Sequence, residues 1–342
     1  MPGFFESVAA GKQHRQLRAA WMIEGKASGA KALFAPKGEQ MTLLCREERF
    51  PAEIAQEICN CSPEQDGILE KGDGRVFLER IADARKLVVC GAGHVSLSLI
   101  RLCVMLGYQV TVIEDRAEYA EKAREAGAHR VICEPFGEAL DGIEGDRSTA
   151  FVIMTREHSH DVECLRGILD KPCAYAGMMG SRSRAGQVRQ QLLEEGRDAG
   201  KVEQLHMPIG LKIGSRTPEE IAVSVAAELI SVMNAMDPGE VFPDGMTEEL
   251  AAMERANAPG GVLAMIVEKS GEAPRRPGTK MLVRNDGSFL GTVGGGYAEA
   301  VILKTAREMI RGRDRESRLV RVSMKKGTMY CGGEVTVFLT PV

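Results

Sequence analysis

Cys331 stands directly before two glycines and a predicted strand, in the stretch CGGEVTVFL. Glycines beside a thiol remove the side chains that would shield it, and Cys331 is the only cysteine within residues 238–342. A nearby arginine or helix terminus would stabilise its thiolate form. The same residue packed in a core would be an ordinary buried thiol, so its chemistry depends on which other residues surround it.

Two further motifs in the same section favour binding of an anion. Arg275 and Arg276 lie between two prolines, which hold the backbone extended so that both guanidinium groups project from a stiff loop. Guanidinium groups recognise phosphate or carboxylate in a bidentate manner. The stretch TVGGGYAEA joins a predicted strand to a helix through Gly294, Gly295 and Gly296, whose amides can approach an anionic ligand closely.

Each of the three motifs has an ordinary structural alternative: a buried thiol, a solvated basic loop and a tight turn between a strand and a helix. Their co-occurrence in one small section favours a site for a phosphorylated ligand that also needs a sulfur atom.

A different motif, VVCGAGHVS, follows a predicted strand and opens a helix. Gly91 and Gly93, next to His94, stand where a dinucleotide-binding fold needs a tight turn and a close approach to a pyrophosphate. Glu114 ends the next strand, at the distance expected for the acid that binds a ribose. Ser96 replaces the third glycine of the fingerprint. The pattern favours nucleotide binding, and the alternative is a scaffold that binds no nucleotide or binds one only structurally.

Two other stretches of the same section are candidates: MTREHSHD, which follows a predicted strand, and AGMMGSRSRAGQ, which is predicted to open a helix. MTREHSHD carries His158, His160 and Asp161, which could coordinate a metal, although residues two apart diverge on a helix and His160 is expected to face solvent. The second stretch combines a helix start with arginines, which together make an anion site or an ordinary solvated helix entry. Its residues are Gly180, Ser181, Arg182 and Arg184.

The elements that position these motifs fall into sections of different texture. Residues 85–236 alternate strand-length apolar runs with helical stretches, which predicts a Rossmann-like parallel sheet in an α/β fold. This section ends in a helix with a capping box of Thr217 and Glu220, and residues 237–247 are rich in proline and glycine and are predicted to be a linker. Residues 248–342 predict a small α+β domain with a hairpin turn at 285–287.

Residues 1–84 resemble the last section faintly. LRAAWMIEGKASGAKALF aligns with GVLAMIVEKSGEAPRRPG, and GRVFLERI aligns with EVTVFLTP. A weak repeat that flanks a different domain suggests a duplicated unit, and the alternative is chance similarity between short α/β segments. The first section has no PRRPG, no triple glycine and no CGG, so a degenerate copy would contribute structure or contacts and no ligand chemistry.

Composition narrows the class of protein. The chain has 342 residues, 44% hydrophobic and 27% charged, and a net charge of -4, which gives no reason to expect nucleic acid or an anionic membrane as a partner. No apolar run has the length of a membrane span, and the first residues lack the order of a signal peptide, so we expect a cytoplasmic protein. Nine scattered cysteines do not form a disulfide framework.

Taken together, these motifs resemble the xanthine dehydrogenase accessory factor family, the XdhC/CoxI group. The resemblance covers the last section, with GTVGGGYAE and CGGEVTVFL, and the Rossmann section, with YAGMMGSRSR and PIGLKIGSRTPEEIAVSVAAE. It implies an accessory factor that binds molybdenum cofactor, protects it while a cysteine desulfurase installs a sulfido ligand, and delivers it to an apo-hydroxylase. Such a factor would be a cofactor chaperone rather than a catalyst, and we assign it no catalytic residue.

The resemblance also assigns roles to particular residues. Cys331 matches the family's cysteine and would be a ligand to the metal or a local sulfur relay. The residues expected to contact molybdenum cofactor are Arg275, Arg276, Gly294, Gly295, Gly296, Glu299, Cys331, Gly332 and Gly333. This chain departs from the family pattern in having its small domain last, Tyr297 where many members have a cysteine, and Arg156 where a histidine is usual.

Two other functions stay open. The Rossmann section would suit an NAD(P)-dependent oxidoreductase acting on a small ligand, although the sequence contains no recognisable hydride-transfer site. A protein-binding adaptor with relic sites is the third alternative. A homodimer is expected because a site on a small domain commonly needs cover from a neighbour.

Overall fold

A computed structural model describes residues 2–11, 17–72, 74–81, 85–156, 158–236, 242–256, 260–272, 275–323 and 333–342. The chain forms two compact units, one from Ala84–Pro238 and one that combines Met1–Asp83 with Gly239–Val342. The first and last sections of the sequence therefore fold together. Within the described parts of the chain, no helix combines the length and the apolar character that crossing a bilayer requires.

The unit Ala84–Pro238 is built on a parallel sheet with the strand order β10-β9-β6-β7-β8. Its strands are β6 (Lys86–Cys90), β7 (Gln109–Ile113), β8 (Arg130–Ile132), β9 (Thr149–Ile153) and β10 (Tyr175–Met178). The chain order reverses between β6 and β9, as in a Rossmann fold, and ligands bind such sheets outside the carboxyl ends of the strands at this point. The predicted Rossmann-like sheet is confirmed.

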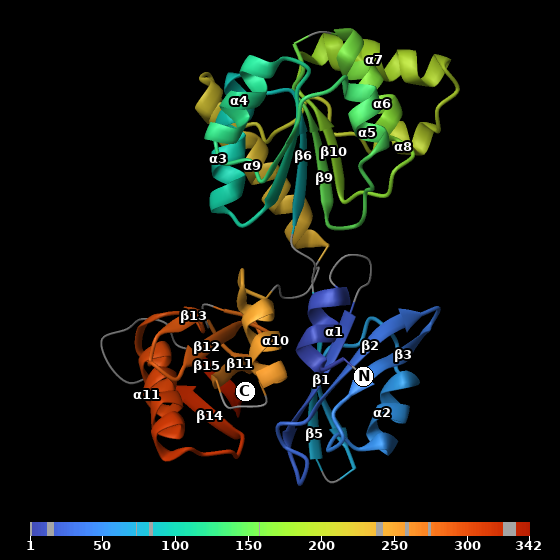
Figure 1. The fold of residues 1–342 in the computed structure, drawn as a ribbon. Helices are drawn as coiled ribbons and strands as arrows, with labels where there is room; N and C mark the ends of the chain where they lie inside the picture. Colours follow the sequence, from blue (N-terminus) through green and yellow to red (C-terminus); the bar gives the residue numbers. More distant parts are fainter. Residues whose placement is uncertain are drawn as a thin grey trace. The chain divides into compact units, whose positions relative to one another are not determined.

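Helices cover both faces of this sheet (Figure 1). The helices on one face are α3 (His94–Met105), α4 (Ala117–Glu125) and α9 (Pro218–Ala235), and those on the other are α5 (Phe136–Asp141), α6 (His158–Ile168), α7 (Arg182–Glu194) and α8 (Ala199–Glu203). The predicted capping box is present at the start of α9, because Thr217 Oγ1 accepts the Glu220 amide and the Glu220 side chain accepts the Thr217 amide.

The other unit contains the same series of elements twice. The first series is α1 (Phe4–Gly11), β1 (Leu17–Glu24), β2 (Lys31–Lys37), β3 (Gln40–Arg46), α2 (Ala52–Cys59), β4 (Gly67–Lys71) and β5 (Gly74–Ile81). The second is α10 (Met246–Ala256), β11 (Gly261–Ser270), β12 (Lys280–Arg284), β13 (Phe289–Gly291), α11 (Gly296–Gly312), β14 (Arg318–Ser323) and β15 (Glu334–Pro341). The sheet orders correspond strand for strand, β3-β2-β1-β5-β4 and β13-β12-β11-β15-β14.

The strand registers also correspond. Trp21 of β1 pairs with Lys31, and Met265 of β11 pairs with Lys280. The register also shifts at the same place in both halves. The pairing of β1 with β5 shifts after Met22, the residue that follows Trp21, and the pairing of β11 with β15 shifts after Ile266, the residue that follows Met265. This register reproduces the alignment expected from the sequence, and it is the topology that a duplicated unit requires. We therefore propose that 1–84 and 248–342 are two copies of one ancestral domain.

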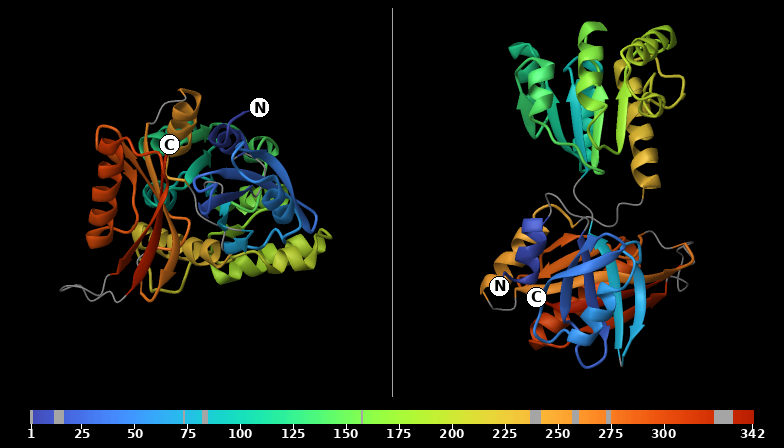
Figure 2. Two further views of the ribbon diagram at one scale, coloured as in Figure 1. Left: turned by 90° about the horizontal axis from the view of Figure 1, so that it is seen from below. Right: turned by 90° about the vertical axis from the view of Figure 1, so that its right-hand side faces the viewer.

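The two halves share a hydrophobic core. Trp21 and Phe77 of the first half and Leu250, Met265 and Phe338 of the second belong to one buried cluster. The outer face of each sheet is covered by its own helix, α2 in the first half and α11 in the second, and these helices lie on opposite sides of the unit (Figures 1 and 2).

The first helix of the chain is held by the second half. The Glu254 carboxylate of α10 accepts hydrogen bonds from the amides of Phe4 and Phe5 at the start of α1, at 2.8 and 3.0 Å. These first amides of a helix have no partner within the helix, so a carboxylate placed there satisfies them and complements the helix dipole. The first half thus depends on the last for local structure as well as for core packing.

Candidate functional site

Three connections that carry the sequence motifs start at the same end of the sheet β13-β12-β11-β15-β14, the sheet of the second half. β11 ends at Ser270, which pairs with Glu334 at the start of β15, and Glu334 also pairs with Ser323 at the end of β14. The connections 271–279 and 324–333 therefore begin and end beside one another. Gly291, the last residue of β13, pairs with Met281 near the start of β12, so the glycine loop starts at this end too.

The equivalent connections of the first half are shorter. β1 and β2 are joined by residues 25–30, where β11 and β12 are joined by 271–279. β4 and β5 are joined by residues 72–73, where β14 and β15 are joined by 324–333. The extra chain in the second half contains the arginines and the CGG motif. Cys331 and Gly332 lie outside the described residues, and Gly333 is buried next to β15.

The base of the arginine loop is fixed by hydrogen bonds. Gly278 has a φ of +93°, its amide donates to the Ile266 carbonyl at 2.7 Å, and Thr279 Oγ1 donates to the Arg276 carbonyl at 2.8 Å. Only glycine takes such a φ without strain. Arg275 and Arg276 are exposed at this turn. A fixed base below exposed guanidinium groups is an arrangement that suits recognition of an anion.

Glu299 organises the glycine loop from inside. Its carboxylate accepts the amides of Val293 and Gly295, each at 3.3 Å, and the hydroxyl of Thr292. Gly294, Gly295 and Gly296 have φ values of +118°, +72° and +60°, which side chains with a Cβ rarely adopt. Of the three glycine amides that we expected to face a ligand, that of Gly295 thus contacts Glu299 instead, and direct contact of Glu299 with a cofactor stays a prediction.

The predicted dinucleotide turn lies at the carboxyl end of β6. Gly91 has a φ of +102°, and a Cβ built there would stand 2.5 Å from the Met154 carbonyl oxygen after β9. Gly93 is the N-cap of α3, and His94 is exposed at the first position of this helix. Ser96, which replaces the third glycine, is buried with its Oγ 3.6 Å from Met154 Sδ. Serine is therefore small enough for the packing that this position needs.

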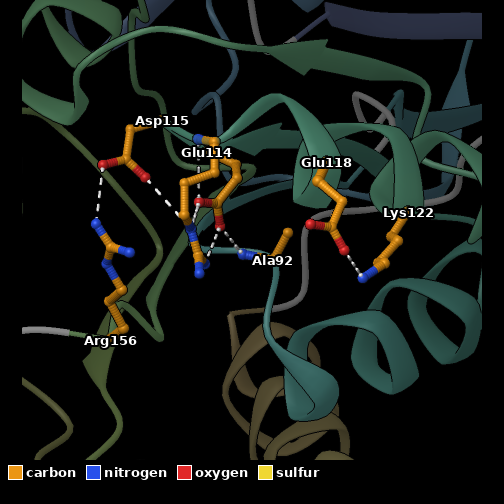
Figure 3. Close-up of polar contacts among 7 residues, drawn as sticks. Ala92, Glu114, Asp115, Glu118, Lys122 and Arg156 are labelled. Atoms are coloured by element: carbon orange, nitrogen blue, oxygen red, sulfur yellow. Dashed lines mark hydrogen bonds and ion pairs between the residues drawn. The ribbon is translucent and has the colours of Figure 1, made fainter.

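Glu114 lies at the end of β7 and connects this turn to the next strand. Its Oε2 accepts the Ala92 amide at 2.8 Å, and its Oε1 accepts Arg116 Nε at 2.7 Å (Figure 3). The hydrogen bond to Glu114 raises the pKa of Arg116, whose guanidinium carbon lies 3.7 Å from the centre of the Tyr119 ring. The Glu114 side chain is only 1% exposed, so a ribose would have to reach a carboxylate that already binds protein groups.

Asp115 is a second carboxylate at this place that sequence reasoning missed. Its side chain is 26% exposed, and its Oδ2 lies 3.8 Å from an Arg156 guanidinium nitrogen (Figure 3). Asp115 and Arg156 line a pocket of about 190 Å³ together with Gly91 and Gly93. Sites for drug-sized ligands have volumes of about 300 Å³ or more, so this pocket is small for a dinucleotide. The signal in the sequence was that Asp115 directly follows Glu114 at a strand end.

The motifs MTREHSHD and GSRSR are joined by one buried carboxylate. Asp161 accepts Thr155 Oγ1 at 2.5 Å and Arg184 Nη2, and its side chain is 1% exposed. Burial lowers the pKa of Arg184. Arg184 thus pairs inside the protein, which corrects the interpretation of this helix start as an anion site built on it. Ser181 Oγ accepts the Arg184 amide as the N-cap of α7.

The metal interpretation of MTREHSHD finds no support in the described geometry. Asp161 is committed to its pair with Arg184, and His160 lies 3.3 Å from Glu163 and against the Phe136 ring, so it is not simply solvated. Over the residues that the structure describes, no three or more His, Cys, Asp or Glu side chains gather where they could hold a metal ion.

The string PIGLKIGSRTPEEIAVSVAAE runs from Pro208 to Glu228, and Glu228 anchors it. Its Oε2 accepts Tyr175 Oη at 2.5 Å and the Gly210 amide at 2.8 Å, and the His206 ring stacks on Tyr175 with centroids 4.3 Å apart. Burial opposes ionisation of Glu228, but hydrogen bonds from His206, Tyr175 and Gly210 together lower its pKa. The sequence analysis did not single out this cluster, because its members lie far apart in the chain.

These features define a protein with a Rossmann unit and a second unit in which two sheets of the same strand order share a core. Residues 87–229 match the XdhC Rossmann domain, and residues 255–323 match the XdhC and CoxI family. The chain belongs to the XdhC/CoxI family, as its motifs predicted.

The curated relatives match part of the chain. A probable xanthine dehydrogenase component of Bacillus subtilis is 31% identical over 157 residues, which are 45% of this chain and 45% of that protein. The molybdenum cofactor insertion chaperone PaoD of Escherichia coli is 43% identical over 82 residues, 23% of this chain and 26% of that protein. The uncharacterised protein YqeB of Escherichia coli is 31% identical over 46% of this chain and 29% of its own length. The chain thus spans less than half the length of these relatives.

A solved structure shares the fold. The crystal structure of a xanthine dehydrogenase from Bacillus halodurans superposes with a TM-score of 0.53 and 21% identity, over 68% of this chain and 67% of that chain.

Proposed function

We propose that this protein binds molybdenum cofactor, supports its sulfuration and inserts it into a hydroxylase of the xanthine dehydrogenase or CO dehydrogenase type. The observation that carries the proposal is the arrangement of the second sheet, where the connections 271–279 and 324–333 and the glycine loop leave one end. Membership of the XdhC/CoxI family and the similarity to an insertion chaperone support this cargo.

The roles of the residues follow from their chemistry. Arg275 and Arg276 would bind the pterin phosphate, because exposed guanidinium groups on a fixed loop form bidentate hydrogen bonds with phosphate. The glycine loop would line the approach of the cofactor, held in shape by Glu299. Cys331, followed by Gly332 and Gly333, would supply a soft sulfur ligand to molybdenum or a sulfur relay.

The proposed partners are an apo-hydroxylase that receives the cofactor and a cysteine desulfurase that supplies sulfur. We further propose a cytoplasmic location and a homodimer, in which the neighbouring copy covers the exposed site. In this role the protein is a carrier, and no residue is assigned to turnover chemistry.

The test removes the phosphate-binding groups and counts bound metal. Arg275→Ala/Arg276→Ala should lower affinity for purified molybdenum cofactor about 100-fold or more, because hydrogen bonds to charged groups contribute about 1.5–3 kcal/mol each. Molybdenum that co-elutes with the protein in gel filtration is measured by mass spectrometry, and Cys331→Ser is tested in parallel.

A matched control is Arg311→Ala/Arg315→Ala. These arginines are also exposed, but they lie beside Asn285 and Pro341, at the opposite end of the same sheet. The control should retain molybdenum like the unmodified protein. Equal loss in both double variants would show that general charge attracts the cofactor, and equal retention in all of them would refute the site.

An NAD(P)-dependent oxidoreductase is the alternative, favoured by the positive φ of Gly91 and by the Glu114 carboxylate at the strand end. The small pocket and the internal hydrogen bonds of Glu114 weigh against it. Titration of the protein with NADH and NADPH, followed by cofactor fluorescence, separates the two functions. Glu114→Ala should weaken any nucleotide binding that this titration detects.

A further inference from the structure

One buried ion pair links the two halves of the duplicated unit. Lys280 Nζ lies 2.7 Å from Glu79 Oε2, and the two side chains are 0% and 4% exposed. Glu79 belongs to β5 of the first half, and Lys280 is the first residue of β12 in the second half. The other oxygen of Glu79 accepts Trp21 Nε1 at 2.8 Å, and Lys280 Nζ lies 4.4 Å from the centre of the Phe242 ring.

The same lysine also contacts the arginine loop. Lys280 Nζ donates to the Gly278 carbonyl at 2.8 Å, and the Gly278 amide donates to Ile266. The peptide groups on both sides of Gly278 are thereby fixed, two residues after Arg276. Glu79 forms an ion pair with the Lys280 ammonium group, which in turn donates to the Gly278 carbonyl. A residue of the first half therefore acts on the arginine loop of the second half.

Comparison of the halves shows that only the lysine of the second half pairs with an acid of the other half. Lys31 is the counterpart of Lys280, since each is the first residue of its strand and pairs with Trp21 or Met265. Lys31 forms its ion pair with Glu47 of its own half. The Glu47 amide donates to the Lys31 carbonyl, as the Thr292 amide donates to the Lys280 carbonyl.

Thr292 therefore stands where Glu47 stands in the first half. Thr292 begins the glycine loop, and its hydroxyl binds Glu299. A threonine has no carboxylate that could pair with Lys280. The carboxylate that pairs with Lys280 comes instead from Glu79 of the first half. The counterpart of Glu79 in β15 is Thr340, because Glu79 pairs with Ala19 of β1 and Thr340 pairs with Leu263 at the equivalent position of β11.

We propose that Glu79 is a positioning residue for the anion-binding arginine loop, acting through Lys280 on the Gly278 carbonyl. The first half is then more than a support for the core, because it supplies the charge that fixes the ligand loop of the second half. A buried ion pair adds little net stability over an apolar pair of similar size. The presence of the pair between Glu79 and Lys280 is therefore explained better by the geometry that it imposes on the loop. This inference rests on the proposed function only in taking the loop as the binding element.

The test replaces the ion pair by a neutral pair of similar size, Glu79→Gln/Lys280→Met. This double variant leaves no buried charge unpaired, so it should fold, and circular dichroism checks that it does. Hydrogen exchange of the Gly278 and Thr279 amides should become about tenfold faster or more, since the hydrogen bond to a charged donor is lost. Trypsin should also cut faster after Arg275, and molybdenum cofactor should be retained about tenfold less tightly.

The matched control is Lys31→Met/Glu47→Gln, which removes the equivalent pair of the first half. It should leave exchange at Gly278, cleavage after Arg275 and cofactor retention unchanged. If Glu79→Gln/Lys280→Met does not fold, Glu79→Asp serves instead, because it keeps the charge and shortens the reach to Lys280. Trp21 is the only tryptophan of the chain, so its emission reports directly on the Glu79 site in each variant.

The outcomes separate this inference from the proposed function. Faster exchange with weaker cofactor retention, in this variant and not in the control, supports both. Faster exchange with unchanged retention supports the positioning role and counts against the arginine loop as the cofactor site. Exchange and cleavage rates equal to those of the unmodified protein overturn the positioning role.

Discussion

Gly91 offers a quantitative test of the turn that opens the Rossmann crevice. It precedes Ala92, whose amide binds Glu114, and its φ of +102° lies outside the range that side chains with a Cβ prefer. A Cβ at this position would stand 2.5 Å from the Met154 carbonyl oxygen and 3.1 Å from the Thr155 Cα. Gly91→Ala is therefore expected to strain both the turn and the chain that follows β9.

The magnitude follows from three contributions. An L-residue in a left-handed conformation costs roughly 1–2 kcal/mol. Moving the main chain at Met154 to relieve the clash adds roughly 1–3 kcal/mol, the usual cost of overpacking. The reduced freedom of the unfolded chain offsets about 0.4–1 kcal/mol. We expect Gly91→Ala to lower the free energy of unfolding of the unit Ala84–Pro238 by about 1–4.5 kcal/mol.

The assay uses the position of the only tryptophan. Trp21 belongs to the other unit, so its fluorescence follows unfolding of that unit, whereas circular dichroism follows both. In urea, Gly91→Ala should show an early dichroism transition while the Trp21 midpoint changes little. Gly93→Ala is the control, because Gly93 has a φ of -74° and nothing within 4 Å of a built Cβ. The reasoning fails if Gly91→Ala is as stable as the unmodified protein or if Gly93→Ala is equally destabilised.

Two further predictions concern stability. Thr217→Ala removes the capping box of α9 and should cost about 1 kcal/mol in urea unfolding, with Thr217→Ser restoring most of the loss. Burial opposes ionisation of Asp146, but hydrogen bonds from Lys86, Ser148 and Thr149 lower its pKa from 3.8 to about 2. Because the folded-state pKa is depressed, this stabilisation is present above pH 3.8 and is lost as the pH falls towards 2. Asp146→Asn should remove that pH dependence, on the order of 1 kcal/mol after allowance for solvent screening of a side chain that is 36% exposed, and an unchanged acid-unfolding curve would contradict it.

Local patterns in the sequence predicted the elements of the fold well. The alternation of apolar runs and helical stretches identified β6, β7, β8 and β9, and the sequence of Thr217 to Glu220 identified the start of α9. Such features depend on residues within a few positions of one another, so their physical causes are visible in one stretch of sequence.

The contacts that shape the candidate sites were not predicted, because their partners are distant in the chain. Glu79 and Lys280 are 201 residues apart, and Asp161 and Arg184 are 23 apart. Sequence reasoning found Glu114 and Arg184 as chemically active types, but it could not show that both side chains bind partners inside the protein. A motif identifies the residue type, and only packing decides whether that residue faces a ligand.

The faint similarity of the two halves is explained by what each position has to do. Trp21 and Met265 occupy the same register position in one shared core, and such a core accepts different apolar side chains when total volume is kept. The core therefore loses sequence identity while it keeps the strand order. The connections change more, since 72–73 and 324–333 join equivalent strands and only the longer one holds a thiol. Ligand chemistry added to the loops of one half does not disturb the shared core. This accounts for two halves with one topology, of which only the second carries the arginine, glycine and cysteine motifs.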